Sequence, residues 1–347
     1  FALEQHFCPQ ERAITAHLPP NNRLDFNLDS SIFHYRDSGM QHCDVCVIGG
    51  GPAGYAAAMR ALDFGKSVIL IEKNKLGGAS IYNGALSSKT LWELSRDVRR
   101  LRITERGYTV FDYKLDYAQI IKVANRAVQE RHEQLAKQVD ELAENICCDR
   151  FRFIHGFGRL QSAHEIEVHT PKGKEVISAE YIVLATGSIP RKLPNVAIDE
   201  KNIVTSDGVG NWDKFPDSLV ILGAGVIGCE FASIFSNFGM TDVRIIDTAD
   251  HILPFEDRDI SDMVTENFIA NGVTIHRNSS LESMTTDENG RVNYTLRFKD
   301  GRVETYNVEK ALVSIGRIPA VEGLGAREIG LAMTDSGNFI VDEDGRT

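Results

Sequence analysis

The chain has 347 residues, of which 42% are hydrophobic and 25% are charged. This composition is typical of globular proteins and excludes collagen-like and wholly disordered chains, while the length predicts about two domains. Lys and Arg number 38 against 49 Asp and Glu, so the formal charge of −11 disfavours a nucleic-acid partner or an anionic membrane surface. No apolar run approaches the roughly 18 residues of a membrane span, and six cysteines are too few for a disulfide scaffold. We therefore expect a protein of a reducing compartment, the cytoplasm or alternatively the mitochondrial matrix.

The first 42 residues show little hydrophobic periodicity and carry a Pro-Pro-Asn-Asn turn signal at 19–22. They predict an extension that precedes the first domain.

A strand, a glycine turn, a helix and a second strand are predicted next. Apolar residues 44–48 run into the turn Gly49-Gly-Gly51-Pro52-Ala53-Gly54, a helix follows over 55–62, and a strand over 67–71 closes at Glu72. In a dinucleotide-binding unit the first glycine allows the turn, the second lets the backbone approach a pyrophosphate, and the third lets helix and strand pack closely. The helix N-terminus attracts the phosphates, and the carboxylate of Glu72 is placed to accept hydrogen bonds from the ribose.

The same unit occurs a second time, which a chance glycine triplet does not explain. A strand over 218–222 leads into Gly223-Ala-Gly225-Val226-Ile227-Gly228, then a helix to about 238 and a strand over 242–246 that ends at Asp247. The acidic residue follows the first glycine by 23 positions in the first unit and by 24 in the second. We therefore predict an α/β protein with two Rossmann-like dinucleotide-binding domains.

Helical and strand patterns also lie between the two units. A long charged helix is predicted from about Asp116, with Leu135, Val139, Leu142 and Ile146 on its apolar face, packing on its own domain rather than as a partner coiled coil. Strands are predicted over 151–154, 165–169 and 181–185, the last ending in a turn that offers Thr186 and Gly187 to a cofactor.

Over residues 43–347 the sequence resembles the FAD-dependent pyridine nucleotide-disulfide oxidoreductases, in particular dihydrolipoamide dehydrogenases and soluble transhydrogenases. The resemblance rests on five motifs in order, namely the first glycine unit with Glu72, GGASIYNGALSSKTL at 77–91, LATGSIPR at 184–191, GAGVIGCEFASIF at 223–235 with Asp247, and SIGRIPAVEGLG at 314–325. It implies an FAD-binding domain over 43–200, an NAD-binding domain over 201–318 and a return to the FAD domain over 319–347.

The resemblance also implies which residues contact each cofactor. Beyond the first glycine unit and Glu72, the FAD contacts are expected at Lys73, Gly78, Ala79, Ser80, Lys89, Thr186, Gly187 and Gly316. The nicotinamide dinucleotide is expected at Gly223, Gly225, Val226, Ile227, Gly228, Glu230 and Asp247. Because Asp247 stands where the extra phosphate of NADP would lie, with Asp250 close behind and no Arg cluster nearby, NAD(H) is the expected nucleotide.

Two departures from the family pattern affect the chemistry. The two redox cysteines of the family correspond here to Ser80 and Ala85, neither of which can form a thiolate. The family's C-terminal interface domain, which carries an acid-base dyad in the family's homodimers, follows a segment like 339–347. We therefore expect either that the polypeptide continues beyond Thr347 or that the dimerisation domain is absent.

The remaining thiols do not replace the redox pair. Cys43 and Cys46 enter a buried strand, where residues three apart are expected to face opposite sides. Cys147 and Cys148 lie at a helix end and Cys229 in a helix, so all are interpreted as structural. No histidine has zinc-like spacing with them, and no metal site is predicted.

Lys89 and Glu230 are the candidate catalytic residues. Lys89 is predicted on a helix whose buried face carries Leu91, Leu94, Val98 and Leu101, and Glu230 in the first turn of the second-unit helix. The family pattern implies that they form an ion pair where the nicotinamide stacks on the flavin. The expected function is hydride transfer between NAD(H) and FAD, with electrons leaving to a second nicotinamide or another small-molecule acceptor. The alternative is a non-catalytic homologue that keeps the fold as a structural or regulatory subunit.

Overall fold

The structure is a computed structural model that describes residues 41–82 and 84–347. The predicted extension over 1–42 lies outside these residues, apart from Gln41 and His42, which is the first residue of a strand. The α/β prediction is confirmed: the described residues form two mainly parallel sheets, a three-stranded antiparallel sheet and a two-stranded ribbon.

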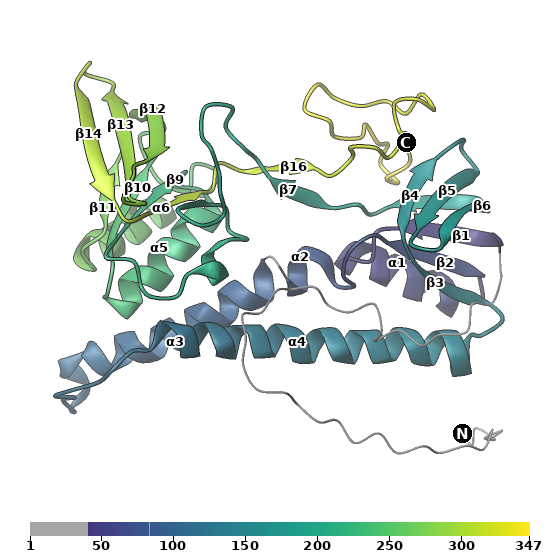
Figure 1. The fold of residues 1–347 in the computed structure, drawn as a ribbon, viewed down its shortest axis with the longest axis horizontal. Helices are drawn as coiled ribbons and strands as arrows, with labels where there is room; N and C mark the ends of the chain where they lie inside the picture. The colour runs from purple at the N-terminus through teal and green to yellow at the C-terminus, as the bar shows by residue number, and fades with distance from the viewer. Residues whose placement is uncertain (1–40, 83) are drawn as a thin grey trace. The chain divides into compact units, whose positions relative to one another are not determined.

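The first sheet has six strands in the order β3-β2-β1-β6-β5-β4 (Figure 1). Its strands are β1 (His42–Ile48), β2 (Val68–Glu72), β3 (Phe151–His155), β4 (Phe157–Leu160), β5 (Glu165–Thr170) and β6 (Gly173–Leu184). The first four strands of that order pair in parallel, and β5 pairs antiparallel with β4 and β6. Helix α1 (Pro52–Asp63) connects β1 to β2 and packs on both. All five residues of β2 are buried, as expected for an apolar strand in the middle of a parallel sheet.

The second sheet repeats this arrangement with five parallel strands in the order β11-β10-β9-β15-β8. Its strands are β8 (Ile203–Val204), β9 (Ser218–Leu222), β10 (Asp242–Ile246), β11 (Thr274–His276) and β15 (Lys310–Val313). Helix α5 (Val226–Phe238) connects β9 to β10, and α6 (Arg258–Ala270) follows β10. The antiparallel sheet consists of β12 (Ser279–Thr286), β13 (Val292–Phe298) and β14 (Val303–Val308).

A two-stranded ribbon joins the segments on either side of the second sheet. Strand β7 (Ser188–Pro190) pairs antiparallel with β16 (Arg317–Pro319). After β16 the chain packs on the core of the first sheet, where Leu324 and Ala326 are buried and Leu324 O accepts a 2.8 Å hydrogen bond from Leu160 N. This agrees with a return to the first domain, although the predicted domain boundaries themselves stay predictions.

The remaining helical segments lie between β2 and β3 of the first sheet, apart from η4, which lies between β8 and β9 of the second. They are α2 (Gly78–Ile81), α3 (Ala85–Arg102), η2 (Thr104–Arg106), α4 (Tyr117–Glu141), the π-helical turn η3 (Leu142–Ile146) and η4 (Val209–Asn211). The Asp116 carboxylate caps α4 by accepting a hydrogen bond from Gln119 N, so the predicted start of the long helix is confirmed.

The π-turn changes which residues the end of the long helix buries. Leu135 and Val139 are buried as predicted, but Ile146 is 62% exposed and Leu142 is only half-buried, so the apolar face predicted there is wrong. Cys147 N donates to Leu142 O, five residues back. The wider turn shifts the buried positions by one residue, to Ala143 and Cys147.

The buried face of α3 also differs from the prediction. Leu91 and Val98 are buried, whereas Leu94 is half-buried and Leu101 is 37% exposed. The fully buried positions are Ser88, Leu91, Ser95 and Val98. Their spacing is still helical, but two of them are polar and small, which lets α3 pack closely on α5 and α4.

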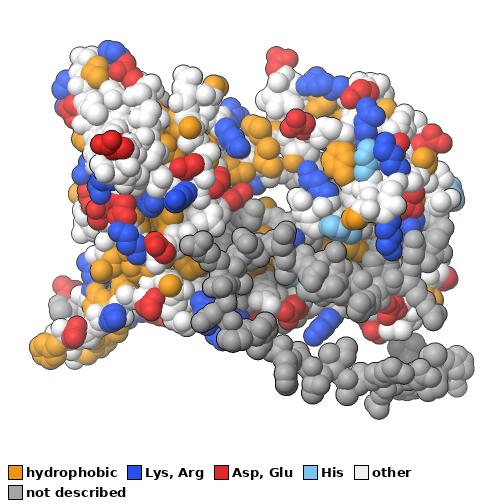
Figure 2. Space-filling view, viewed as in Figure 1, with side chains coloured by type: hydrophobic (Ala, Val, Ile, Leu, Met, Phe, Trp, Pro, Cys, Tyr) orange, Lys and Arg blue, Asp and Glu red, His pale blue; other side chains and the backbone are white. Residues whose placement is uncertain are grey.

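Charge is not collected in one region of the surface that Figure 2 shows, where basic and acidic side chains are interspersed. Among the described residues, none of the helices is long and apolar enough to cross a membrane.

Candidate active site

The first glycine turn, between β1 and α1, has the tight backbone that the sequence predicts. Gly49 has φ +111°, and a Cβ added there would lie 2.2 Å from Ala185 O, in the segment that follows β6. A Cβ added at Gly54 would lie 1.8 Å from Gly49 O. Both positions therefore require glycine, the first for the turn and the second for the contact between helix and strand.

Gly51 is different because its own packing does not require glycine. A Cβ added there meets no atom within 4 Å, so the space in front of this residue is free. Gly51 is the N-cap of α1, which has no side-chain cap and no acidic residue in its first turn, and Pro52 and Ala53 are its first two residues. Uncapped N–H groups facing free space fit a pyrophosphate, as FAD would supply.

The Glu72 carboxylate is buried beside this turn, with 8% of the residue exposed. Its Oε2 accepts a 2.6 Å hydrogen bond from Gly50 N, and its Oε1 accepts one of 2.7 Å from Asn74 N. Each carboxylate oxygen has two lone pairs, so both can also accept from a ribose hydroxyl. The site thus fits the adenosine end of FAD.

The segment that follows β2 is anchored on the same turn. Gly77 N donates a 2.8 Å hydrogen bond to Gly50 O, and a Cβ added at Gly78 would lie 3.2 Å from Gly51 Cα. Ala79 and Ser80 continue α2, where Ser80 Oγ donates to Gly77 O at 2.7 Å. Ala85 is the first residue of α3, and neither Ser80 nor Ala85 carries a thiol.

Four other predicted FAD contacts are Thr186, Gly187, Gly316 and Lys73. Thr186 is beside the first glycine turn, because a Cβ added at Gly49 would lie 3.2 Å from Thr186 N. Gly187 and Gly316 lie next to the β7–β16 ribbon, where Gly187 O accepts from Ala320 N and Gly316 O from Arg191 N, each at 3.0 Å. Lys73 Nζ lies 5.7 Å from the centre of the Phe157 ring.

The second glycine turn, between β9 and α5, repeats the first. Gly223 has φ +102°, and an added Cβ would lie 2.6 Å from Ser314 O; at Gly228 it would lie 2.0 Å from Gly223 O. A Cβ added at Gly225 meets no atom within 4 Å. Gly225 is the uncapped N-cap of α5, and Val226 and Ile227 are the first two residues of that helix. The second turn therefore fits a second pyrophosphate.

The Asp247 carboxylate accepts hydrogen bonds from two backbone N–H groups, as the Glu72 carboxylate does. Its Oδ2 accepts a 2.6 Å hydrogen bond from Ala224 N, and its Oδ1 accepts one of 2.9 Å from Ala249 N. Asp250, three residues later, lies beside His251 and Arg258. The Arg258 guanidinium pairs with Asp250 and Asp262.

Lys89 and Glu230 form the ion pair that the sequence predicts. Lys89 Nζ, on α3, lies 3.0 Å from Glu230 Oε1, on α5. The Lys89 side chain is 63% exposed and that of Glu230 only 18%. Glu230 is the fifth residue of α5, and the first turn of that helix has no acidic residue, so its predicted place in the first turn is wrong. The pair, rather than the helix dipole, therefore holds this carboxylate.

Ser88 also binds Glu230, and sequence reasoning missed it. The Ser88 hydroxyl donates a 3.0 Å hydrogen bond to Glu230 Oε1, the same oxygen that contacts Lys89. The one available signal was its spacing, since Ser88 lies three residues before Leu91 and shares its helix face.

Among the described thiols, Cys229 lies at the second glycine turn, and Cys43 and Cys46 lie in the core of the first sheet. Cys43 and Cys46 are both fully buried in this core, where the Cys43 thiol donates to Ser178 O at 3.8 Å, and their orientation to opposite sides of the strand stays a prediction. Burial raises the pKa of Cys229 to about 12, and its Sγ lies 3.4 Å from Ala224 O. The Cys229 thiol is thus neutral and inert at physiological pH. The described residues contain no group of three His, Cys, Asp or Glu side chains that could hold a metal ion.

The structure has two glycine turns at the ends of parallel strands. Each turn leads into a helix without a side-chain cap and lies beside a carboxylate held by backbone N–H groups. This arrangement defines a protein that binds two dinucleotides. The family of pyridine nucleotide-disulphide oxidoreductases matches residues 43–347, and the chain belongs to this family. Members of this family use FAD and NAD(P)H, the cofactors that the two turns predict.

Among curated relatives, the chain is 35% identical to a dihydrolipoyl dehydrogenase of Zymomonas mobilis, over 88% of the chain and 64% of the relative. It is 33% identical to one of Bacillus subtilis, over 84% of the chain and 62% of the relative. The chain thus spans less than two thirds of the length of these relatives.

Solved structures with the same fold include LpdA from Mycobacterium tuberculosis, with a TM-score of 0.75 and 27% identity, covering 86% of this chain and 64% of that one. The HOCl-induced flavoprotein disulfide reductase RclA from Escherichia coli has a TM-score of 0.72 and 28% identity, covering 86% and 62%.

Proposed function

We propose that this chain is the FAD- and NAD-binding part of an oxidoreductase that transfers hydride between NAD(H) and bound FAD without a redox disulfide. The observation that carries the proposal is the 3.0 Å contact between Lys89 and Glu230. It joins the helix that starts beside the candidate FAD turn to the helix that starts at the candidate NAD turn.

When bound, FAD would supply the acceptor for the hydride of NADH. The residues of the chain bind and orient the two nucleotides. Gly51 and Gly225 leave space for the pyrophosphates, and Glu72 and Asp247 accept from the riboses. Lys89 brings positive charge to the place where reduced flavin gains negative charge, and Glu230 holds the ammonium in position.

The nicotinamide selectivity belongs to the same proposal. Asp247 stands at the end of β10 with both oxygens bound to backbone N–H groups, so it cannot turn away from an incoming ribose without losing two hydrogen bonds. A 2′-phosphate next to this carboxylate meets like charge. NAD(H) is therefore the proposed nucleotide, and the acceptor of the electrons is a second nicotinamide or another small molecule.

The visible spectrum of the purified protein, before and after anaerobic addition of NADH, tests the proposal. A yellow protein whose flavin absorbance bleaches supports it. The proposal also predicts no turnover of lipoamide, glutathione disulfide or mercuric ion at this site, because Ser80 and Ala85 provide no thiolate.

A second candidate function is that of a non-catalytic subunit which keeps the fold. It is favoured by the replacement of both redox cysteines at Ser80 and Ala85. A protein that binds FAD but whose spectrum does not change with NADH would favour this second function.

A further inference from the structure

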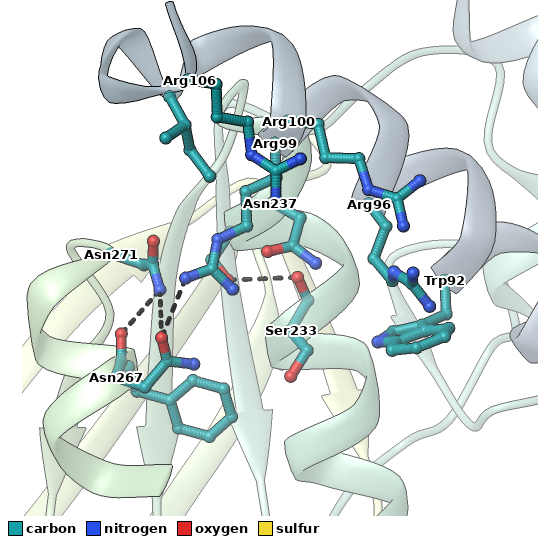
Figure 3. Close-up of a pocket in the computed structure, with 12 residues that line it drawn as sticks. Trp92, Arg96, Arg99, Arg100, Arg106, Ser233, Asn237, Asn267 and Asn271 are labelled. Carbon is teal, nitrogen blue, oxygen red and sulfur yellow. Dashed lines mark hydrogen bonds between the residues drawn. The ribbon is translucent and has the colours of Figure 1, made fainter. Parts of the chain in front are cut away.

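A cavity of about 490 Å³ lies where the C-terminal halves of α3, α5 and α6 meet (Figure 3). Trp92, Arg96, Arg99 and Arg100 line it from α3, Ser233 and Asn237 from α5, and Asn267 from α6. The candidate NAD turn is at the opposite end of α5. Ser233, the α5 lining residue nearest that turn, lies eight positions after Gly225, which is about 12 Å along a helix axis. The cavity is therefore separate from the dinucleotide sites.

The lining is strongly basic. Arg96, Arg99, Arg100 and Arg106 all line the cavity, and none of its twelve lining residues is acidic. This contrasts with the formal charge of −11 for the whole chain. Arginines converging on one cavity repel one another, so their placement needs a compensating charge.

Carboxylates near the cavity compensate only two of the four. Arg96 contacts Glu93 at 3.2 Å and Arg100 contacts Asp97 at 3.0 Å, each within α3. Arg99 donates a 3.0 Å hydrogen bond to Asn267 Oδ1, which is neutral, as Figure 3 shows.

Arg106 has no hydrogen bond or ion pair to any residue that the structure describes. Two guanidinium groups at the cavity therefore lack a negative partner within the described chain.

The negative end of α3 offsets part of the charge of Arg99 and Arg100, which lie in its last turn, whereas another arginine already caps the end of α5. Arg102 Nη1 lies 3.5 Å from Ser236 O and 3.4 Å from Asn237 O, at the C-terminal end of α5. It packs against Gly239, where an added Cβ would lie 2.1 Å from Arg102 Nη1. The four arginines of the cavity are additional to this cap.

The spacing of the arginines indicates the kind of anion. Arg99 and Arg100 lie three and four residues after Arg96, so each leaves the helix about 5–6 Å from Arg96. A single anionic group can contact one or two of these arginines, whereas an anion with linked groups can contact all of them. Guanidinium forks match phosphate oxygens in pairs, and the hydroxyl of Ser233 adds a neutral donor. We propose that this cavity binds a small anion that carries two or more linked phosphate groups.

Isothermal titration calorimetry with inorganic pyrophosphate tests this assignment. The chain is first saturated with FAD and NAD⁺, because the two glycine turns are themselves expected to bind pyrophosphate. The Arg99→Gln/Arg106→Gln variant removes the two uncompensated charges. The control variant Arg126→Gln/Arg346→Gln removes two exposed charges elsewhere, and these two arginines pair with Glu130 and Asp344.

We expect the dissociation constant for pyrophosphate at about 50 mM salt to rise at least tenfold in the cavity variant and less than twofold in the control. Arg106→Gln alone, which breaks no contact within the described residues, should raise it at least threefold. Equal weakening in the two double variants, or no saturable binding of pyrophosphate to the unsubstituted chain, would overturn the proposal. Citrate binding as tightly as pyrophosphate would overturn the assignment to phosphate. The comparison of matched variants does not depend on the proposed hydride transfer.

Discussion

The Ser88 hydroxyl donates a 3.0 Å hydrogen bond to Glu230 Oε1, the carboxylate oxygen that Lys89 also contacts. Ser88 is 5% exposed, so its hydroxyl has little access to water and Glu230 is its partner across the contact between α3 and α5. Hydrogen bonds to charged groups contribute about 1.5–3 kcal/mol to stability. We expect Ser88→Ala to lower the free energy of unfolding by about this amount in urea titrations.

Ser87→Ala provides the matched control for that variant. The Ser87 hydroxyl donates at 3.3 Å to Gly84 O, within its own helix, and its loss should cost less than half as much. Equal losses for the two variants would show that Ser88 does not stabilise Glu230.

The Lys89 ammonium should matter for electron transfer more than for folding, since the side chain is 63% exposed. In Lys89→Ala we expect FAD to remain bound and its reduction by NADH to slow by about tenfold or more, the scale of losing one charge-assisted contact. Anaerobic stopped-flow absorbance measures the rate. Lys122→Ala, on the exposed side of α4, is the control, and an unchanged rate in Lys89→Ala would refute the role.

Substitution of the glycines of the first turn should have two different effects, one on FAD affinity and the other on stability. Gly51→Ala places a Cβ in free space, so the unfolding free energy should change by less than about 1 kcal/mol while FAD affinity falls at least about tenfold. Gly54→Ala places a Cβ 1.8 Å from Gly49 O and should destabilise the fold itself by several kcal/mol, about the upper range for single substitutions. Thermal unfolding and FAD titration measure the two effects, and similar stability losses at both positions would contradict this division.

NADH should reduce the flavin at least about tenfold more efficiently than NADPH, which corresponds to about 1.4 kcal/mol. The reason is the Asp247 carboxylate, held by Ala224 N and Ala249 N at the end of β10. Comparison of kcat/KM for the two nucleotides at physiological salt measures the ratio. A ratio near one would show that Asp247 does not face the ribose.

The contribution of Cys229 to stability should decrease at high pH. Burial raises its pKa to about 12 in the folded protein, from an ordinary value of 9.0. The unfolded chain therefore loses this proton first, so the stabilising contribution is complete below pH 9 and is lost as the pH rises from 9 to 12, by up to about 1.4 kcal/mol per pH unit. The stability difference between the unsubstituted protein and Cys229→Ala should shrink over this range in urea titrations. A difference that stays constant from pH 8 to 10.5 would contradict the prediction.

Both dinucleotide units could be predicted from the sequence because their determinants are local. The positive φ at Gly49 and the close contact of Gly54 with Gly49 O lie within one strand, one turn and one helix, and Gly223 and Gly228 repeat them at the same spacing. The two carboxylates follow their turns at nearly the same interval. Features of this kind can therefore be predicted without knowing how the rest of the chain folds.

The pairing of Lys89 with Glu230 was predicted only through family resemblance. Nothing in the spacing of two residues 141 positions apart indicates a contact, and the 3.0 Å distance depends on how α3 packs against α5.

Tertiary packing alone decided where the helix faces lie. The apolar pattern in the sequence predicts that Ile146 is buried. The π-turn at 142–146 instead directs Cys147 into the core and leaves Ile146 exposed, because the wider turn rotates the backbone. The arginine-lined cavity has the same origin. Arg99 and Asn267 are 168 positions apart, and they meet because the ends of α3 and α6 come together, a contact between distant segments that no local pattern encodes.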